Sequence, residues 1–212
     1  MNIIFDLDGT LWDSSNAILE VWKVIFAEEK IQINKQEIKQ LLGFVNQDII
    51  KWIHINKQVS KDKASLVLQK CQQEEVYYLR KNGGTLFSQV KNTLYELARI
   101  NKLYIVSNCQ RGYIEAFLTF YGIGSLFKDF ECSGNTGKNK AQNIKLILER
   151  NKIKNAVYVG DTAGDCDAAI ANHLPFVFAR YGFGAVMNPT YQINQFNELI
   201  TIISTLEKKG GA

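Results

Sequence analysis

The stretch NIIFDLDGT at residues 2–10 decides how the rest of the chain is interpreted. Its first four residues are mostly apolar and predict a short buried β-strand. Asp6 and Asp8 follow at the strand's end and should point the same way, because side chains alternate across a strand. Two adjacent like charges are costly unless a cation or a shared proton compensates them. Gly9 permits a sharp turn and Thr10 can hydrogen-bond within it, so the stretch predicts a reactive site at the carboxyl end of a parallel strand.

Two further predicted strands also end in polar residues. Apolar runs at 104–106 and 156–159 have the length and composition of buried strands. A lysine-containing segment, 136–140, lies between them and directly precedes a predicted helix. The polar residues beyond the strands are Ser107 and Asn108 after the first run, and Asp161 and Asp165 after the second.

In chain order, these four motifs resemble those of the haloacid dehalogenase superfamily, in its Asp-based, phosphoglycolate phosphatase-like branch. A lone Asp-x-Asp is common by chance, but DxDGT after a strand, with three matching partners at plausible spacings, is specific. The resemblance covers nearly the whole chain. It implies a Rossmann-like core with an inserted helical cap, and an enzyme that hydrolyses phosphomonoesters.

The resemblance also implies roles for the acidic residues. Asp6 is the expected nucleophile, forming an aspartyl-phosphate, and Asp8 protonates the leaving oxygen and later deprotonates the attacking water. Mg²⁺ is the expected cofactor, held by the Asp6 carboxylate and the Asp8 carbonyl, with Asp161 completing the protein ligands. Asp165 is expected beside the metal, orienting a bound water or Lys140. Taken alone, Asp161 equally fits a helix N-cap.

Phosphoryl binding is assigned to residues after the second strand and before the predicted helix at 141–150. Ser107 would hydrogen-bond a phosphoryl oxygen, and the Asn108 N–H would add a donor at a helix start, although Ser-Asn after a strand is often only a turn. A cation must offset the acids and the phosphoryl charge. Lys140 is the first choice and Lys138 the alternative, because the proline that often follows this lysine in the family is absent.

The segment between the first two motifs is predicted to be helical. Apolar spacing predicts helices over 17–29, around 38–42, over 49–55 and over 64–79, with no strand between them. We therefore expect a core of residues 1–14 and 84–212 and a helical cap of residues 15–83. Within the cap, residues 42–47 resemble a substrate-contacting loop, although Gly43 could instead end one helix and Asn46 start the next. The predicted substrate contacts are Gly9, Thr10, Asn46 and Asn108.

From residue 90 onward, helical and strand patterns alternate. This alternation indicates an α/β fold with a doubly wound parallel sheet and helices on both faces. The segment 181–184 is expected to pack beside the site as a loop. The predicted helices are 90–100, 113–121, 141–150, 163–172 and 196–206, and the strands between them are 104–107, 130–132, 156–159 and 176–179.

Composition sets further bounds. The chain has 212 residues, 46% of them hydrophobic, and a net charge of +4. Its lysines are scattered, so we expect no nucleic-acid partner. No window approaches the ~20 apolar residues of a membrane span, and the N-terminus does not resemble a signal peptide, so no membrane partner is expected. The four cysteines lack close pairs, and we expect a cytoplasmic protein with reduced thiols, monomeric or dimeric.

The sequence as a whole favours a Mg²⁺-dependent phosphomonoester hydrolase acting on a small phosphorylated metabolite. The carboxylate of Asp8 argues against a dehalogenase, since displacing halide requires no proton donor. Two alternatives stay open at this point: a phosphosugar mutase of the same fold, and a catalytically idle protein that binds phosphorylated metabolites.

Overall fold

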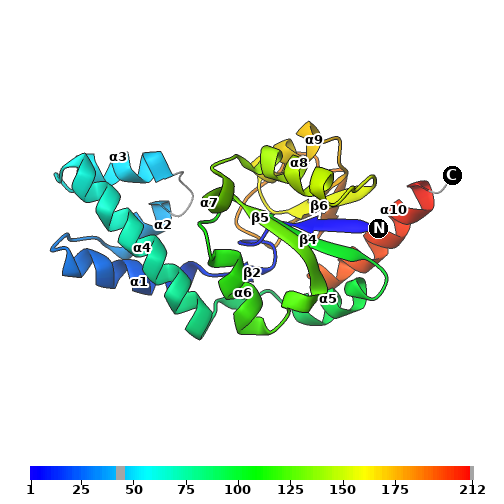
Figure 1. Cartoon of the computed structure of the whole chain (residues 1–212), viewed down its shortest axis with the longest axis horizontal. Helices are drawn as coiled ribbons and strands as arrows, with labels where there is room; N and C mark the ends of the chain where they lie inside the picture. The colour runs from blue at the N-terminus through cyan, green and yellow to red at the C-terminus, as the bar shows by residue number, and fades with distance from the viewer. Residues whose placement is uncertain (42–45, 211–212) are drawn as a thin grey trace. The chain divides into compact units, whose positions relative to one another are not determined.

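The computed structural model describes residues 1–41 and 46–210. The chain divides into two compact units: a sheet unit of residues 1–13 and 85–212, and a helical unit of residues 14–84. Figure 1 gives the order of the elements along the chain. The strands are β1 (Asn2–Phe5), β2 (Trp12–Asp13), β3 (Thr85–Leu86), β4 (Lys102–Ser107), β5 (Phe127–Cys132), β6 (Ala156–Gly160), β7 (Phe176–Ala179) and β8 (Tyr191–Ile193). The helices are α1 (Ser15–Glu28), α2 (Lys35–Leu41), α3 (Asn46–Asn56), α4 (Lys61–Asn82), α5 (Val90–Ala98), α6 (Tyr113–Tyr121), α7 (Ser133–Thr136), α8 (Lys140–Arg150), α9 (Ala163–Ala171) and α10 (Leu199–Gly210), with short 3-10 turns at Gly124–Leu126 and Phe196–Glu198.

Six strands form the main sheet, in the order β5-β4-β1-β6-β7-β8. Every neighbouring pair is parallel, and Phe5 on the central β1 is level with Ile105 on one side and Val159 on the other. The carboxyl ends of β1, β4 and β6 therefore meet at one edge of the sheet. The predicted doubly wound α/β fold is confirmed.

Helices cover both faces of this sheet (Figure 1). On one face, α8 and α9 pack against β4, β5, β6 and β7. The cluster buried there includes Ile144 and Ile147 of α8 with Tyr104 and Tyr158 of the strands. On the other face lie α5 and α10. Because apolar side chains emerge on both sides of the sheet, its strands lack the polar alternation of a half-exposed sheet.

Several short elements escape the sequence analysis. The two-residue strands β2 and β3 pair antiparallel, and β8 adds an edge strand to the main sheet. Trp12 is fully buried in β2. Its ring lies edge-on to those of Tyr113 and Phe117, with centroids 5.6 and 5.0 Å away. Strands of two or three residues carry too little periodicity to be recognised from sequence.

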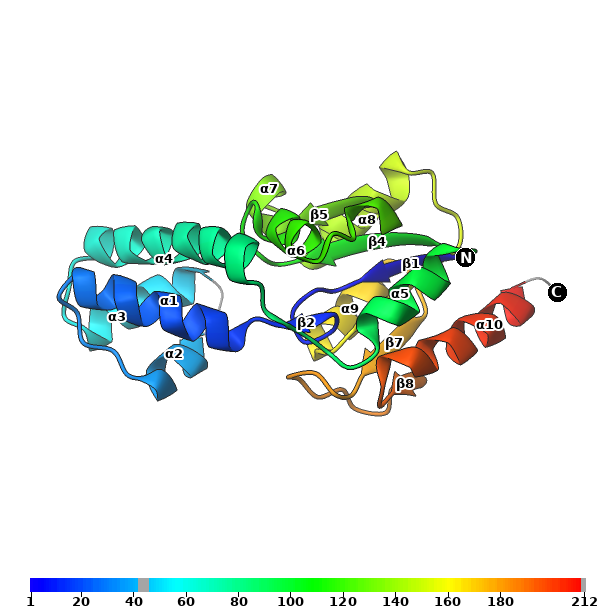
Figure 2. The ribbon, with the colours of Figure 1, turned by 90° about the horizontal axis from the view of Figure 1, so that it is seen from below.

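The helical unit has a hydrophobic core of its own. In Figure 2, α1 and α4 run side by side, and α2 and α3 complete the bundle. Trp22 and Phe26 of α1 stack with centroids 6.0 Å apart in this core. The α4 helix is longer than predicted, because Ser60 accepts a hydrogen bond from the Lys63 N–H at its start and the apolar pattern misses its polar ends.

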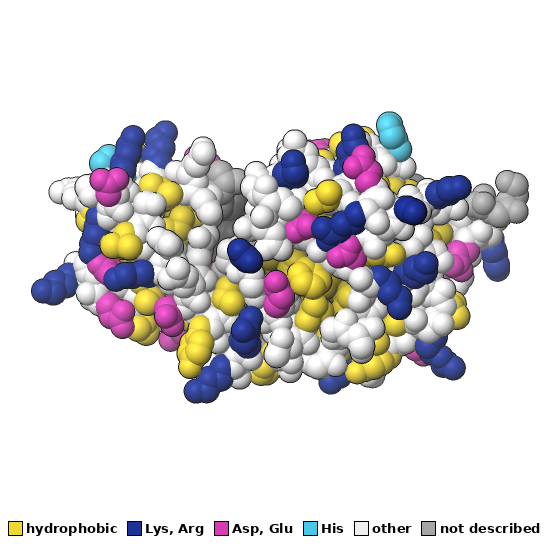
Figure 3. Space-filling view, in the orientation of Figure 1, with side chains coloured by type: hydrophobic (Ala, Val, Ile, Leu, Met, Phe, Trp, Pro, Cys, Tyr) yellow, Lys and Arg dark blue, Asp and Glu magenta, His cyan; other side chains and the backbone are white. Residues whose placement is uncertain are grey.

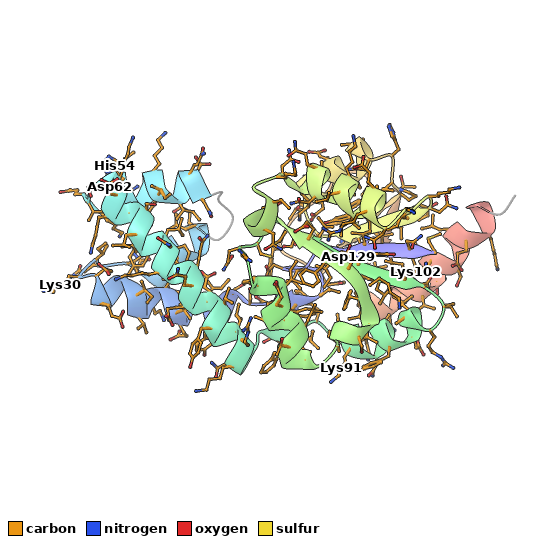
Figure 4. The ribbon with its side chains drawn as sticks, viewed as in Figure 1. Lys30, His54, Asp62, Lys91, Lys102 and Asp129 are labelled. Atoms are coloured by element: carbon orange, nitrogen blue, oxygen red, sulfur yellow. The ribbon has the colours of Figure 1, made fainter. Side chains whose placement is uncertain are left out.

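Charged side chains are mixed on the surface (Figure 3), and His54 contacts a nearby backbone carbonyl. On the face drawn in Figure 3, Lys and Arg side chains are dispersed among acidic and neutral ones. His54, labelled in Figure 4, lies on α3 with Nδ1 2.6 Å from the Val59 carbonyl oxygen. Within residues 1–41 and 46–210, no helix combines the length and apolar character that a bilayer span requires.

Candidate active site

Asp6 and Asp8 extend beyond the tip of β1 and engage different partners. The strand ends at Phe5, although the Asp6 N–H still donates to the Val159 carbonyl at 2.9 Å. Asp6 Oδ1 lies 2.8 Å from the Lys140 ammonium, whereas Asp8 Oδ1 accepts a hydrogen bond from the Tyr113 hydroxyl at 2.9 Å. Neither residue lies in the strand, so the alternation of side chains along a strand does not determine where the two carboxylates point.

Lys140 connects the central acids. It is the first residue of α8, after Asn139, which forms a capping box with Gln142. Its side chain is buried, and its ammonium contacts both Asp6 and Asp165. Lys138, the alternative lysine, is exposed. Of the two candidate lysines, Lys140 is therefore the one that contacts Asp6 and Asp165.

Asp161 and Asp165 follow β6 and are both fully buried. Thr162 is the N-cap of α9, and Asp165 completes a capping box by accepting from the Thr162 N–H at 2.9 Å. Asp161 is therefore not the helix cap that the sequence left open. The two oxygens of Asp165 have different donors: Oδ2 accepts from the backbone at the start of α9, and Oδ1 accepts from the Lys140 ammonium. Asp167, two residues further along α9, is exposed.

The buried acids have the donor chemistry of a divalent cation site. Asp6, Asp161 and Asp165 each offer a carboxylate oxygen, all within 4.8 Å of one another. One ammonium faces three carboxylates, so full ionisation would leave a net charge of −2. Clustered oxygen ligands of this kind suit Mg²⁺. The Asp8 side chain lies outside this group, and its expected contribution was its backbone carbonyl.

Burial and crowding shift the pKa values within this cluster. Burial, and then the charge of Asp165, raises the pKa of Asp6 well above its ordinary value despite the adjacent ammonium. Burial also raises the pKa of Asp161, against the backbone N–H of Phe183. For Lys140, burial opposes the charge, but Asp6 and Asp165 outweigh it and raise its pKa. A bound cation would relieve the repulsion among the carboxylates.

The loop after β7 holds Asp161 in place, a role that the sequence analysis did not assign. The Phe183 N–H donates to Asp161 Oδ2 at 2.8 Å, and the Tyr181 hydroxyl donates to the Thr10 carbonyl at 2.8 Å. A Cβ on Gly182 would lie 2.3 Å from the Asp161 Cβ and 2.4 Å from the Gly9 carbonyl oxygen. The two glycines at 182 and 184, directly after a strand of the sheet, were the available signal for this close approach.

Gly9 and Thr10, predicted as substrate contacts, pack against the same carboxylate. Gly9 has a φ of +81°, and an added Cβ would lie 2.2 Å from Asp161 Oδ2. Thr10 is fully buried, with Oγ1 3.5 Å from Asp161 Oδ1. These contacts align the turn after β1 with the tip of β6. Their role in binding substrate stays a prediction.

Ser107 and Asn108 mark the end of β4. Ser107 is 4% exposed, and its Oγ accepts from the Cys109 N–H at 3.4 Å, so a local turn is formed. Asn108 is exposed and its side chain accepts from the Ser133 hydroxyl at 3.1 Å. The expected helix start at Asn108 is wrong, because α6 begins only at Tyr113. The assigned phosphate contact of Ser107 stays a prediction.

The predicted cap loop falls partly outside the described residues, which omit 42–45. Asn46 belongs to α3, and its side chain accepts a hydrogen bond from Gln72 Nε2 at 3.0 Å. Both residues belong to the helical unit. The alternative, in which Gly43 ends one helix and Asn46 starts the next, falls partly on the omitted residues and stays a prediction. A substrate contact by Asn46 stays a prediction.

Comparisons with known proteins agree with this architecture. Residues 3–179 match the family model described as haloacid dehalogenase-like hydrolase. A phosphoglycolate phosphatase from Photorhabdus laumondii is 25% identical over 219 residues, covering 95% of this chain and 91% of the relative. A haloacid dehalogenase-like family hydrolase from Streptococcus pneumoniae superposes with a TM-score of 0.77 at 23% identity, covering 95% of this chain and 97% of the other. A predicted phosphoglycolate phosphatase from Haemophilus somnus gives a TM-score of 0.81 at 20% identity, with coverage of 95% and 97%.

Proposed function

The chain belongs to the haloacid dehalogenase-like hydrolase family, and on that premise we propose that it is a Mg²⁺-dependent phosphomonoester hydrolase acting through an aspartyl-phosphate. The observation that carries the proposal is the position of Asp6. Its carboxylate is 5% exposed, lies 2.8 Å from the Lys140 ammonium, and shares a compact group with two further carboxylates. A buried nucleophile beside a fixed cation is the arrangement that attack on an anionic phosphoryl group requires.

The proposed reaction has two halves. In the first, an Asp6 oxygen bonds to phosphorus while the bond to the leaving oxygen breaks, and Asp8 gives its proton to that oxygen. In the second, Asp8 takes a proton from water as the water's oxygen bonds to phosphorus and Asp6 is released. Lys140 and the hydroxyl of Ser107 offset charge on the phosphoryl oxygens.

The metal would be held by Asp6 and Asp161 with the Asp8 carbonyl, and Asp165 would orient Lys140 beside it. When bound, Mg²⁺ supplies positive charge to the phosphoryl oxygens. The helical unit is the proposed cap, whose role is to select the leaving group and exclude water. The phosphoglycolate phosphatase similar to this chain supports a small phosphorylated metabolite as substrate. We also propose that the protein works in the cytoplasm.

A phosphate-release screen tests the proposal. The protein is incubated with Mg²⁺ and phosphoglycolate, sugar phosphates, nucleotides or pyrophosphate, and inorganic phosphate is measured. We expect release from at least one phosphomonoester, loss of release on chelation, and recovery when Mg²⁺ is restored. Asp6→Asn should abolish release while the melting curve keeps a folded transition, whereas Asp167→Asn, at an exposed position of α9, should behave as wild type.

Three outcomes would contradict the proposal. Interconversion of phosphosugar isomers without phosphate release would identify a mutase. Stoichiometric ligand binding, with no turnover across the panel, would identify a binding protein. Full activity of Asp6→Asn would exclude Asp6 as the nucleophile.

A further inference from the structure

Tyr113 makes a contact that the functions assigned so far do not use. It lies in the first turn of α6, directly after Gly112, and only 1% of the residue is exposed. Its hydroxyl donates a hydrogen bond to Asp8 Oδ1 across 2.9 Å. Both residues belong to the sheet unit, so the contact lies within one compact body.

The ring of Tyr113 is held against the same turn that carries Asp8. Trp12 packs edge-on against Tyr113, with an interplanar angle of 80°. The Trp12 backbone is tied back to the turn, because its carbonyl accepts from the Gly9 N–H at 2.9 Å and Asp8 and Trp12 form an isolated bridge. Phe117, one helical turn further along α6, also lies edge-on to the indole, with ring centroids 5.0 Å apart. The phenol and the carboxylate are therefore connected both by a hydrogen bond and by packing.

We infer that Tyr113 is a positioning residue for Asp8, fixing the carboxyl group for proton transfer to the leaving oxygen and from the attacking water. This inference rests on the proposed function, in which Asp8 is the acid and base. A flexible carboxyl group on a turn would sample many orientations, and proton transfer is efficient only from a group held within hydrogen-bond reach of the reacting oxygen. A buried side chain whose rotamer is locked by packing supplies that constraint.

The direction of the hydrogen bond also selects the oxygen that carries the proton. Tyr113 donates to Oδ1, which makes protonation of Oδ1 unfavourable and places the transferable proton on Oδ2. As the leaving-group bond to phosphorus breaks, that proton moves from Oδ2 to the departing oxygen. In the second half, the proton of water returns to the carboxylate. Tyr113 keeps its own proton throughout.

Tyr113→Phe tests the inference, because it removes the hydroxyl and keeps the ring. The measurement is kcat/KM for phosphate release from two substrates, p-nitrophenyl phosphate and an alkyl phosphate. The nitrophenolate leaves without a proton, whereas the alkoxide requires one. General acid catalysis contributes about 10²–10⁴-fold, and we expect Tyr113→Phe to lower kcat/KM on the alkyl phosphate about tenfold or more beyond any loss on p-nitrophenyl phosphate.

Tyr121→Phe is the matched control. Tyr121 lies on the same helix, with its ring 6.3 Å from that of Trp12, so its substitution also removes a hydroxyl from this aromatic cluster. We expect Tyr121→Phe to change kcat/KM by the same factor for both substrates. In addition, Tyr113→Phe should cause no further loss when Asp8 is already Asn, because two residues that act through one group are not additive.

Three outcomes would overturn the inference. Equal losses on both substrates would make Tyr113 a packing residue only, and undiminished activity on the alkyl phosphate would exclude any positioning role. An additive loss in the Asp8→Asn background would show that Tyr113 does not act through Asp8. The absence of Asp6-dependent phosphate release by the wild type would instead refute the proposed function, and the inference with it.

Discussion

Three buried carboxylates of the sheet unit lie close together, whereas two carboxylates of the helical unit, those of Glu75 and Glu29, have donors of their own. Asp6, Asp161 and Asp165 converge on one another around a single ammonium. In the helical unit, the buried Glu75 accepts a hydrogen bond from the indole N–H of Trp22, and Glu29 contacts the ammonium groups of two lysines.

This difference separates a site from a scaffold. Uncompensated like charges lower the stability of the folded state, and a protein retains them where a ligand or a reaction uses them. Carboxylates that each have a donor of their own, by contrast, hold the elements of a helical bundle together. Four predictions test this distinction, taken from the largest expected effect to the smallest.

Removing the central ammonium should have the largest effect. Lys140→Met leaves Asp6 and Asp165 buried without their cation, and loss of one partner from a buried ion pair costs about 3–5 kcal/mol. We expect turnover to fall by about 10³-fold, since the charge opposite the phosphoryl group is lost as well. Phosphate release and thermal unfolding measure the two effects. Lys138→Met, at an exposed position two residues earlier, should match wild type in both; similar losses from the two variants would contradict the central role of Lys140.

A cavity in the helical unit should lower the unfolding temperature of that unit and leave the unfolding temperature of the sheet unit nearly unchanged. Phe26 is fully buried and stacked on Trp22, and Phe→Ala in a core costs about 3–5 kcal/mol. Calorimetry of Phe26→Ala should show an early transition for the helical unit, followed by one close to the wild-type temperature for the sheet unit. The control is Val24→Ala on the same helix, where the side chain is 56% exposed. A single transition, shifted as a whole, would mean that the two units do not melt independently.

The sequence predicted those parts of the fold in which a local pattern repeats. The strand at 2–5 and the helix at 141–150 were recognised because apolar residues recur along them. The choice between Lys138 and Lys140 could not be made in this way, because both precede the helix and only the capping register at Asn139 decides which one turns inward.

Contacts across long stretches of chain were equally out of reach. The hydrogen bond between Tyr113 and Asp8 joins residues 105 positions apart. It depends on where α6 begins, and no local pattern in the sequence indicates a role for Tyr113 beyond its predicted helix. The close approach of Gly182 to Asp161 also requires two strand tips to be neighbours in the sheet, which periodicity alone does not establish.

Filling the space at Gly182 should displace Asp161 and weaken the site. In Gly182→Ala the new methyl group would overlap the Asp161 side chain at 2.3 Å. Substitution of residues that orient metal ligands typically lowers metal affinity or activity about 10–100-fold. We expect kcat/KM to fall by that factor in Gly182→Ala, together with a higher Mg²⁺ requirement. Gly164→Ala serves as control, because the nearest atom to its added Cβ is 3.7 Å away. Wild-type Mg²⁺ dependence in Gly182→Ala would show that Asp161 is not held by this loop.

The smallest expected effect is on folding stability, whose dependence on pH should have opposite signs for a carboxylate of the helical unit and one of the sheet unit. In the helical unit, the hydrogen bond from Lys57, and then that from the Asn34 N–H, lowers the pKa of Glu37 below its ordinary 4.5. Its ionised form therefore stabilises the fold above pH 4.5, and this contribution is lost as the pH falls through the lowered pKa. We expect Glu37→Gln to cost about 0.5 kcal/mol at pH 7, the value of a solvent-screened pair, and less as the pH falls.

For Asp6, the pH dependence of folding stability should have the opposite sign. Its pKa is raised above the ordinary 3.8, so without Mg²⁺ its ionisation destabilises the fold as the pH rises from 3.8 through the raised pKa. In the presence of a chelator, Asp6→Asn should therefore gain stability relative to wild type as the pH rises, while Glu37→Gln loses it. Urea unfolding of the two variants at several pH values measures both differences. If the two had the same sign, the buried acids of the sheet unit would be as well compensated as the ion pairs of the bundle, and the difference between site and scaffold would not hold.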